Sequence, residues 1–268
     1  MDVIPVIDVR MGVAVKAIAG DRANYKPLAT PLCEGSDPRA VLDGLMALHP
    51  FPLIYLADLD GIEGRGANLM MIGECVGRVE AALSQPRPDT LGTLEIRRVS
   101  AQVGASTRPT DAPFALWVDT GARSSGDVAA LLKRAGVCCV IGSETGIGPE
   151  EFTALDALFP GRLVLSLDFR ADGYVGDPAL LADPARWPSR VIAMTLAKVG
   201  GGQGPDLGRI TDLKQRAGDR LIYAAGGIRN RADLDAAAAA GAAGALISSA
   251  LHAQTITAAD LRSAAVTG

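Results

Sequence analysis

One unit occurs twice in this chain, and the two copies keep a constant offset of 106 residues. Each copy has a glycine turn followed, some twenty residues later, by an apolar run that ends in Gly-Ser or Ser-Ser. The matched pairs are Arg123 and Arg229, Asp127 and Asp233, Ile141 and Ile247, and Ser143 and Ser249. A register held over several pairs predicts a strand, glycine turn, helix and second strand that the fold uses twice.

A second internal repeat lies nearer the N-terminus, where Asp8-Val9-Arg10 matches Asp168-Phe169-Arg170 at an offset of 160 residues. The first half therefore carries about 54 residues more than the second. We predict an inserted segment at about 77–112, because this Pro- and Gly-containing stretch is much longer than one helical connection requires. The segment is expected to be a surface excursion or a lid or contact element.

Short apolar runs that end in Asp, Gly, Ser, Thr or Ala alternate with stretches of helical period, which indicates parallel strands joined by helices. The expected strands are 3–8, 53–58, 114–119, 137–142, 163–168, 191–195, 221–225 and 245–248. Eight such units define an α/β fold, the (β/α)₈ TIM barrel, built here from two half-barrel repeats. The 268 residues are expected to form a single barrel domain with the insertion.

Composition narrows the range of partners. A formal net charge of −4 with no run of Lys or Arg argues against nucleic acid and against an anionic membrane surface. We found neither a secretion signal nor an apolar span, and the four cysteines lack metal-like spacing, so a cytoplasmic location is expected. A small soluble partner is favoured, and nothing in the sequence predicts an oligomeric state.

The candidate catalytic residues are Asp8 and Asp168, which end the first and fifth expected strands. In an eightfold barrel these strands lie opposite each other, and the strand ends form the active-site face. Two carboxyl groups that share one pocket can act as acid and base if the surroundings raise the pKa of one of them. The alternative for each Asp is a helix cap or a pair with Arg10 or Arg170.

Glycine turns at the ends of consecutive strands are candidate phosphate sites, because their backbone N–H groups bind anions without Lys or Arg. The alternative is a tight turn that requires a positive φ angle. The second-half loops, which follow strands seven and eight, are the stronger candidates. The predicted phosphate-binding residues are Gly121, Gly142, Ser143, Gly226, Gly227, Ser248 and Ser249.

Asp58 and Asp60 at the end of the second expected strand are candidate substrate contacts, as is Thr195 at the end of the sixth. No third ligand accompanies the two aspartates at usable spacing, so no metal is predicted. His49 and His252 have no identifiable Ser or Cys partner, which leaves a hydrolase triad unsupported. Both histidines are expected at the surface.

Together these motifs resemble the histidine-biosynthesis barrel family, which comprises ProFAR isomerase and the cyclase subunit of imidazole glycerol phosphate synthase. The resemblance covers nearly the whole chain outside 77–112. It rests on the segments 4–8, 12–16, 20–21, 55–61 with Asn68, 165–168 and 224–228. The pairs Gly20-Asp21 and Asp58-Leu59-Asp60-Gly61 look more like the isomerase than the cyclase.

The resemblance implies an aldose–ketose isomerase that converts a phosphoribosyl aminal into a ketose by an Amadori rearrangement, in histidine biosynthesis or derived from it. It implies that Asp168 is the acid that opens the sugar ring and that Asp8 is the base that removes the C2 proton. No cofactor is implied. The substrate is implied to be a small phosphorylated molecule with two phosphates anchored across the barrel mouth.

The chain departs from the family pattern at three strand ends. The family's Gly-Gly-Gly-Ile-Arg on strand three reads Asp119-Thr120-Gly121-Ala122-Arg123, which brings a carboxylate close to the first phosphate, where like charges repel. On strand eight, Gly-Arg has become Ser248-Ser249, and on strand six two acidic positions after Thr195 are missing.

The glycine-rich stretch 200–206 is instead similar to a divergent, ProFAR-isomerase-related group in archaea and methylotrophs. Two alternatives therefore stay open. One is a lyase or cyclase of the same barrel that acts on a phosphorylated precursor in one-carbon coenzyme (methanopterin or methanofuran) biosynthesis. The other is a noncatalytic phosphosugar sensor or assembly partner that uses the inserted segment as its contact surface.

Overall fold

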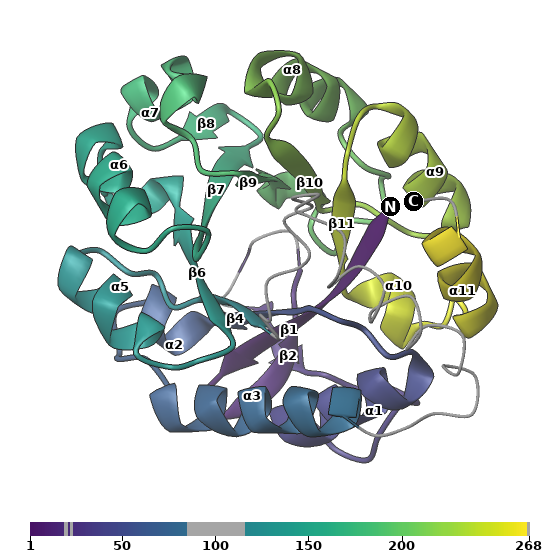
Figure 1. Cartoon of the computed structure of the whole chain (residues 1–268). Helices are drawn as coiled ribbons and strands as arrows, with labels where there is room; N and C mark the ends of the chain where they lie inside the picture. Colours follow the sequence, from purple (N-terminus) through teal and green to yellow (C-terminus); the bar gives the residue numbers. More distant parts are fainter. Residues whose placement is uncertain (19–20, 22–23, 85–115, 267–268) are drawn as a thin grey trace, which may run out of the picture.

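The computed structural model describes residues 1–18, 21, 24–84 and 116–266. Within these ranges eight parallel strands close into a barrel, and helices ring the strands (Figure 1). In order around the barrel the strands are β1 (Asp2–Arg10), β4 (Ile54–Asp58), β5 (Leu116–Asp119), β6 (Val137–Gly142), β7 (Leu163–Arg170), β9 (Arg190–Thr195), β10 (Leu221–Ala225) and β11 (Gly244–Ile247). Parallel pairing of β11 with β1 closes the ring, with Leu246 opposite Ile4. The fold is a (β/α)₈ barrel, as the sequence predicts.

Each of the eight expected runs overlaps one barrel strand, although 114 and 115 lie outside the described residues. Strands β1 and β7 run two residues beyond their aspartates because each turns back on itself. The returning strands are β2 (Val13–Lys16), which continues to β3 (Lys26–Pro27), and β8 (Gly173–Val175).

The described helices are α1 (Pro38–Leu48), α2 (Leu59–Ile62), α3 (Leu69–Ser84), α5 (Ser125–Leu132), α6 (Pro149–Leu158), α7 (Pro178–Ala182), α8 (Leu207–Ala217), α9 (Arg231–Ala239), α10 (Ser249–His252) and α11 (Ala258–Val266). Three short 3₁₀ turns are η3 (Ser143–Thr145), η4 (Pro184–Arg186) and η5 (Leu196–Lys198). Side-chain caps start several helices. Asp37, for example, accepts the Arg39 N–H at 2.8 Å, and Pro38 occupies the first turn, where no donor is needed.

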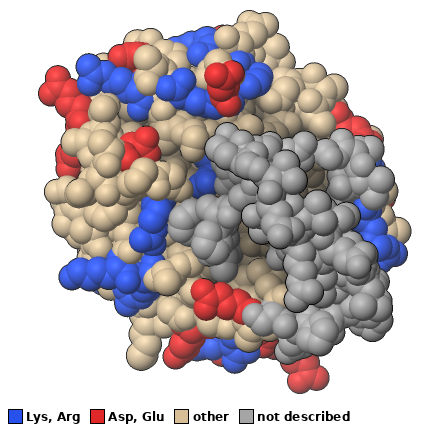
Figure 2. All heavy atoms as spheres, viewed as in Figure 1, with Lys and Arg blue, Asp and Glu red and all other residues tan. Residues whose placement is uncertain are grey.

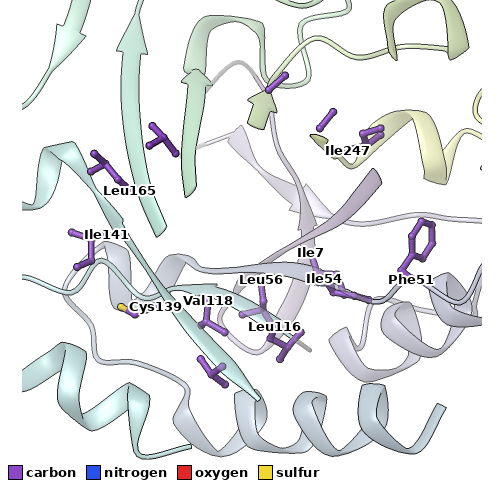
Figure 3. Close-up of a cluster of buried hydrophobic side chains, with 14 of the residues drawn as sticks. Ile7, Phe51, Ile54, Leu56, Leu116, Val118, Cys139, Ile141, Leu165 and Ile247 are labelled. Carbon is purple, nitrogen blue, oxygen red and sulfur yellow. The ribbon is translucent and has the colours of Figure 1, made fainter. Parts of the chain in front are cut away.

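The core has two layers because side chains alternate along each strand. One set faces outward and packs under the helices, as Leu56, Val118, Cys139 and Ile141 do in Figure 3. The other set fills the barrel, where the rings of Trp117 and Tyr223 meet edge to face at 4.8 Å. This packed interior leaves the ends of the strands as the place for a binding cavity.

The half-barrel repeat is visible in backbone pairing. Asp8 lies opposite Val15 in the β1–β2 hairpin, and Asp168 lies opposite Val175 in the β7–β8 hairpin, seven residues later in each case. Helix starts repeat as well. Asp127 accepts the Arg123 N–H at 3.1 Å, and Asp233 accepts the Arg229 N–H at 2.9 Å.

The first eight residues of the predicted inserted segment belong to a helix. Residues 77–84 continue helix α3, because the buried apolar positions Ile72, Val76 and Val79 keep the helical period past residue 77. The rest of the predicted segment, 85–112, lies outside the described residues. None of the helices in the described ranges has the length and apolar character that a membrane crossing requires.

Candidate active site

A cavity of about 690 Å³ opens at the carboxyl ends of the barrel strands. Asp8 from β1 and Asp168 from β7 both line it, and these strands are the first and fifth of the ring, so the two residues come from opposite sides. Figure 2 shows that acidic and basic side chains are interspersed over the face in view. The structure thus brings the two predicted carboxyl groups into one chamber, as their places at the strand ends require.

Asp168 is 6% exposed, and two hydroxyl groups hold its carboxyl group. Ser166 Oγ donates to Oδ1 at 2.8 Å and Ser143 Oγ donates to Oδ2 at 3.3 Å. Burial raises the pKa of Asp168 to about 7, and the negative charges of Asp119 and Glu144 add to the rise, while the two serine hydroxyls oppose it. At neutral pH a substantial share of Asp168 is therefore protonated.

A third carboxylate, Asp119, ends β5 in the same cavity. The Tyr55 hydroxyl donates to its Oδ2 at 3.2 Å, and the Gly121 N–H donates to its Oδ1 at 2.8 Å. Burial, followed by the negative charges of Asp119, Asp8 and Asp168, raises the pKa of Tyr55 far above its usual range. Tyr55 is consequently a neutral hydrogen-bond donor in the lining of the cavity.

The two half-barrels contribute matching rims to the cavity. The first-half rim consists of Asp119, Gly121, Gly142 and Glu144 at the ends of β5 and β6. The second-half rim consists of Ala225, Gly226, Gly227, Ser248, Ser249 and Ala250 at the ends of β10 and β11. Six of the seven predicted phosphate-binding residues line the cavity in these rims.

The rim glycines are also turn glycines, so the two interpretations of them are compatible. Gly121, Gly226 and Gly227 have φ angles of +62°, +99° and +88°, which favour glycine. A Cβ on Gly227 would lie 2.2 Å from the Gly204 carbonyl oxygen. The turn therefore needs glycine for its own shape, and the same shape leaves backbone at the cavity surface.

Ser143, the seventh predicted phosphate-binding residue, does not line the cavity. Its single hydroxyl hydrogen is shared between the Val175 carbonyl, at 2.5 Å, and Oδ2 of Asp168, at 3.3 Å. Its oxygen accepts the Asp168 N–H at 3.0 Å, and together these bonds tie the end of β6 to the β7–β8 hairpin. Within the described part of the chain, no hydrogen bond holds the hydroxyls of Ser248 and Ser249.

Asp58, Asp60 and Thr195 also lie outside the cavity lining. Asp58 caps α2 and accepts the Asn68 side-chain amide at 2.7 Å, while Asp60 accepts the Met11 N–H at 2.8 Å and pairs with Arg65 at 2.7 Å. These contacts brace the loop after β4. Thr195 is buried, 7% exposed, at the end of β9.

His252 is not at the surface, as the sequence predicted, but 6% exposed in α10, and its Nδ1 lies 3.1 Å from the Thr30 hydroxyl. Burial lowers the pKa of His252 to about 4, so the ring is neutral at physiological pH. The error arose because α10 turns its inner face onto the barrel wall, which no periodicity reveals in a helix of four residues. His49 is half-buried beside Phe51.

Several cavity residues were missed from the sequence. Tyr55 could have been found by period-two alternation, since it shares its strand face with Ala57, but Glu144, Lys198 and Arg229 lie in turns without such a signal. Among the described residues, no group of three or more His, Cys, Asp or Glu side chains is arranged to hold a metal ion.

The molecule is a (β/α)₈ barrel with opposed carboxyl groups between two glycine-turn rims, the architecture of a barrel enzyme that binds a small molecule at its strand ends. Residues 99–257 match the family model described as "Histidine biosynthesis protein", and the chain belongs to that family.

Relatives match along nearly the full chain. An uncharacterised protein of Methanocaldococcus jannaschii is 25% identical over 256 residues, which cover 94% of this chain and 93% of that protein. An imidazole-4-carboxamide isomerase of Halobacterium salinarum, whose name specifies two phosphoribosyl groups, is 27% identical over 274 residues, with 98% and 96% covered. Phosphoribosyl isomerase A of Streptomyces griseus is 26% identical over 265 residues, with 96% and 95% covered.

Proposed function

We propose that this protein is an aldose–ketose isomerase that carries out an Amadori rearrangement on an aminated phosphoribosyl substrate. The observation that carries the proposal is the pair Asp8 and Asp168, which line one cavity from opposite strands, one of them with a pKa near neutrality. Relatives named as isomerases support this reaction over a lyase or a cyclase.

Asp168 is suited to act as the acid. In the first step its carboxyl proton passes to the ring oxygen of the sugar, the bond from C1 to that oxygen breaks, and the amine nitrogen lone pair forms a C1–N double bond. A carboxyl group with a pKa of about 7 is both protonated often enough and acidic enough for this transfer at neutral pH. The Ser166 hydroxyl, 2.8 Å from Oδ1, fixes the orientation of the carboxyl group.

Asp8 is suited to act as the base from the other side of the cavity. It takes the C2 proton, and the electron pair left behind forms a C1–C2 double bond while the iminium nitrogen becomes neutral. The resulting enolamine tautomerises to the ketone, with C2–OH losing a proton and C1 gaining one. The product is an isomer of the substrate, so the reaction consumes no co-reactant.

The second-half rim is suited to bind a phosphate of the substrate. Gly226 and Gly227 present backbone at the cavity surface, and Ser248 and Ser249 add hydroxyl donors. Lys198 lines the cavity nearby, although its Nζ donates to the Pro205 carbonyl at 3.1 Å. An anchored phosphate would hold the reacting carbons between the two carboxyl groups, which is how positioning lowers the barrier.

The test is an NMR assay with N-substituted ribosylamine 5-phosphates, including the two-phosphoribosyl compound named for the relatives and its analogues with one phosphate. We expect the wild-type protein to convert at least one of them to the 1-amino-ketose. Failure of the folded protein to convert any would overturn the proposal. Asp212→Asn, a change at an exposed position of α8, is the control and should leave turnover unchanged.

A further inference from the structure

The two rims correspond residue by residue but differ in charge. At the offset of 106, Asp119 matches Ala225 and Glu144 matches Ala250, and all four residues line the cavity. The repeat therefore places a carboxylate in the first half at two cavity positions where the second half has a methyl group. Among the described cavity-lining residues between 194 and 255, none carries a carboxylate.

Asp119 already accepts the hydrogen bond from the backbone N–H that a bound anion would need at the first-half glycine turn. Its Oδ1 accepts the Gly121 N–H at 2.8 Å, and the Tyr55 hydroxyl holds Oδ2 at 3.2 Å. The carboxylate thus fills the place at the glycine turn that a phosphate oxygen would take. In the second-half rim, the residue at the matching position is Ala225, which has no side-chain acceptor to compete for the turn.

The cations that line this part of the cavity are exposed to solvent or hydrogen-bonded to the backbone. Arg170 pairs with Glu144 at 3.5 Å, but its side chain is 58% exposed, so solvent screens the pair. Arg123 donates to the carbonyls of Gly121 and Ile62, at 3.1 and 2.8 Å, which turns its guanidinium toward the backbone. Lys16 lines the cavity from β2, on the other side of β4 from the first-half rim.

We propose that Asp119 and Glu144 exclude a phosphate from the first-half rim, so that the substrate carries one phosphate and no second anionic group. This inference rests on the proposed isomerase function and deepens it. Two fixed carboxylates beside a phosphate raise its free energy through like-charge repulsion, and the occupied Gly121 amide removes the hydrogen bond that would compensate.

The test compares binding of the two-phosphoribosyl compound with binding of the two analogues that lack one phosphate or the other. Dissociation constants are measured by calorimetry, with Asp8→Asn in every protein so that no turnover occurs. We expect the parent to bind one of the single-phosphate analogues at least as tightly as the two-phosphate compound. With Asp119→Ala and Glu144→Ala added, the two-phosphate compound should bind about 10-fold tighter or more.

A second variant separates charge from shape. Asp119→Asn with Glu144→Gln keeps the size of both side chains, and it should also tighten binding of the two-phosphate compound if repulsion is the cause. The control, Asp212→Ala with Asp235→Ala, removes two exposed carboxylates outside the cavity and should change nothing. Tighter binding of the two-phosphate compound by the parent, with no gain in either variant, would overturn the inference.

The outcomes also distinguish this inference from the isomerase proposal. If the wild-type protein isomerises the two-phosphate compound as efficiently as a single-phosphate analogue, the isomerase proposal stands and the single-phosphate inference fails. If the binding preference is found but no compound is isomerised, the inference about the rim stands and the isomerase proposal fails.

Discussion

The first-half and second-half rims have the same backbone plan, but the first carries two carboxylates and the second is uncharged. In each, a glycine turn follows one strand and a hydroxyl-bearing turn follows the next. The first-half rim ties its parts together, since Asp119 holds the Gly121 amide and the Ser143 hydroxyl bonds to Val175. The second-half rim leaves the hydroxyls of Ser248 and Ser249 unbonded within the described residues.

The comparison teaches that a duplicated framework does not imply two copies of a binding site. Under the proposed exclusion of phosphate, two carboxylates make the first-half glycine turn a purely structural turn, while the helix caps and hairpins around it match those of the second half. The two candidate catalytic carboxyl groups, in contrast, come one from each half, as Asp8 and Asp168, and both line the cavity.

The largest expected effect comes from changing the two aspartates that occupy matching strand ends in the two halves. Asp8→Asn and Asp168→Asn should each reduce kcat by about 10²- to 10⁴-fold, because each removes one side of the acid–base pair. Circular dichroism should show that both variants fold, since both side chains lie at the cavity and Asn has nearly the same shape. Full activity in both would contradict the assignment of acid and base.

The next largest effect is expected when a carboxylate is introduced into the second-half rim at the position that matches Asp119. Ala225→Asp places a carboxylate in the second-half rim as Asp119 does in the first, and affinity for ribose 5-phosphate should fall about 100-fold by repulsion and loss of the turn donor. Ala225→Asn, of equal size and without charge, is the matched control and should lose much less. Equal losses would show that bulk, and not charge, controls phosphate binding.

The pH profile sharpens the comparison through Asp168, which the first-half carboxylates influence. As an acid with a pKa of about 7, Asp168 should give kcat/KM a limb that falls as pH rises through about 7. Glu144→Gln removes a charge that raises this pKa, so the limb should move to lower pH. Ser166→Ala removes a hydrogen bond that lowers it, so the limb should move to higher pH.

The pH dependence of the free energy of unfolding should also depend on the ionisation of Asp168. The pKa of Asp168 is raised from 3.8 to about 7 on folding, so its contribution to stability is greatest below pH 4 and is lost as pH rises through 7. Asp168→Asn should therefore be more stable than wild type at pH 8 to 9, by roughly 1–4 kcal/mol. The difference measured by urea unfolding should shrink as pH falls toward 4, and a loss of stability at pH 9 would contradict the buried, raised-pKa carboxyl group.

The smallest expected effect tests whether matched helix caps contribute equally to stability in the two half-barrels. Ser124 and Asn230 cap α5 and α9 at matched positions, accepting the N–H groups of Asp127 and Asp233 at 3.2 and 3.0 Å. Replacing either residue by Ala should cost about 1 kcal/mol in the free energy of unfolding. Chemical denaturation of the two variants should give similar values, and a large difference would show that the halves are not equivalent in their framework.

The fold was predictable because barrel strands are apolar runs bounded by polar residues, and all eight runs became strands. Asp8 and Asp168 were predictable as cavity residues because strand direction alone brings the ends of β1 and β7 to one face. The offset of 106 also predicted the two glycine rims, since register in the sequence becomes symmetry in the barrel.

Other features depend on side-chain directions in turns, which periodicity does not encode. Asp58 ends β4 and Asp60 follows in α2, but both bond to Asn68 in the loop that they brace, and the Ser143 hydroxyl bonds to the Val175 carbonyl. Asp119 showed itself in the sequence as a charge beside a glycine turn, but its bond to the Gly121 amide became evident only from the structure.

The most direct test of the account is the fate of the C2 hydrogen of an N-substituted ribosylamine 5-phosphate in deuterated water. Wild-type protein should catalyse ketose formation with loss of this hydrogen to solvent, and Asp8→Asn should abolish the loss. Release of the C2 hydrogen at the wild-type rate by Asp8→Asn would contradict proton removal by the β1 carboxylate.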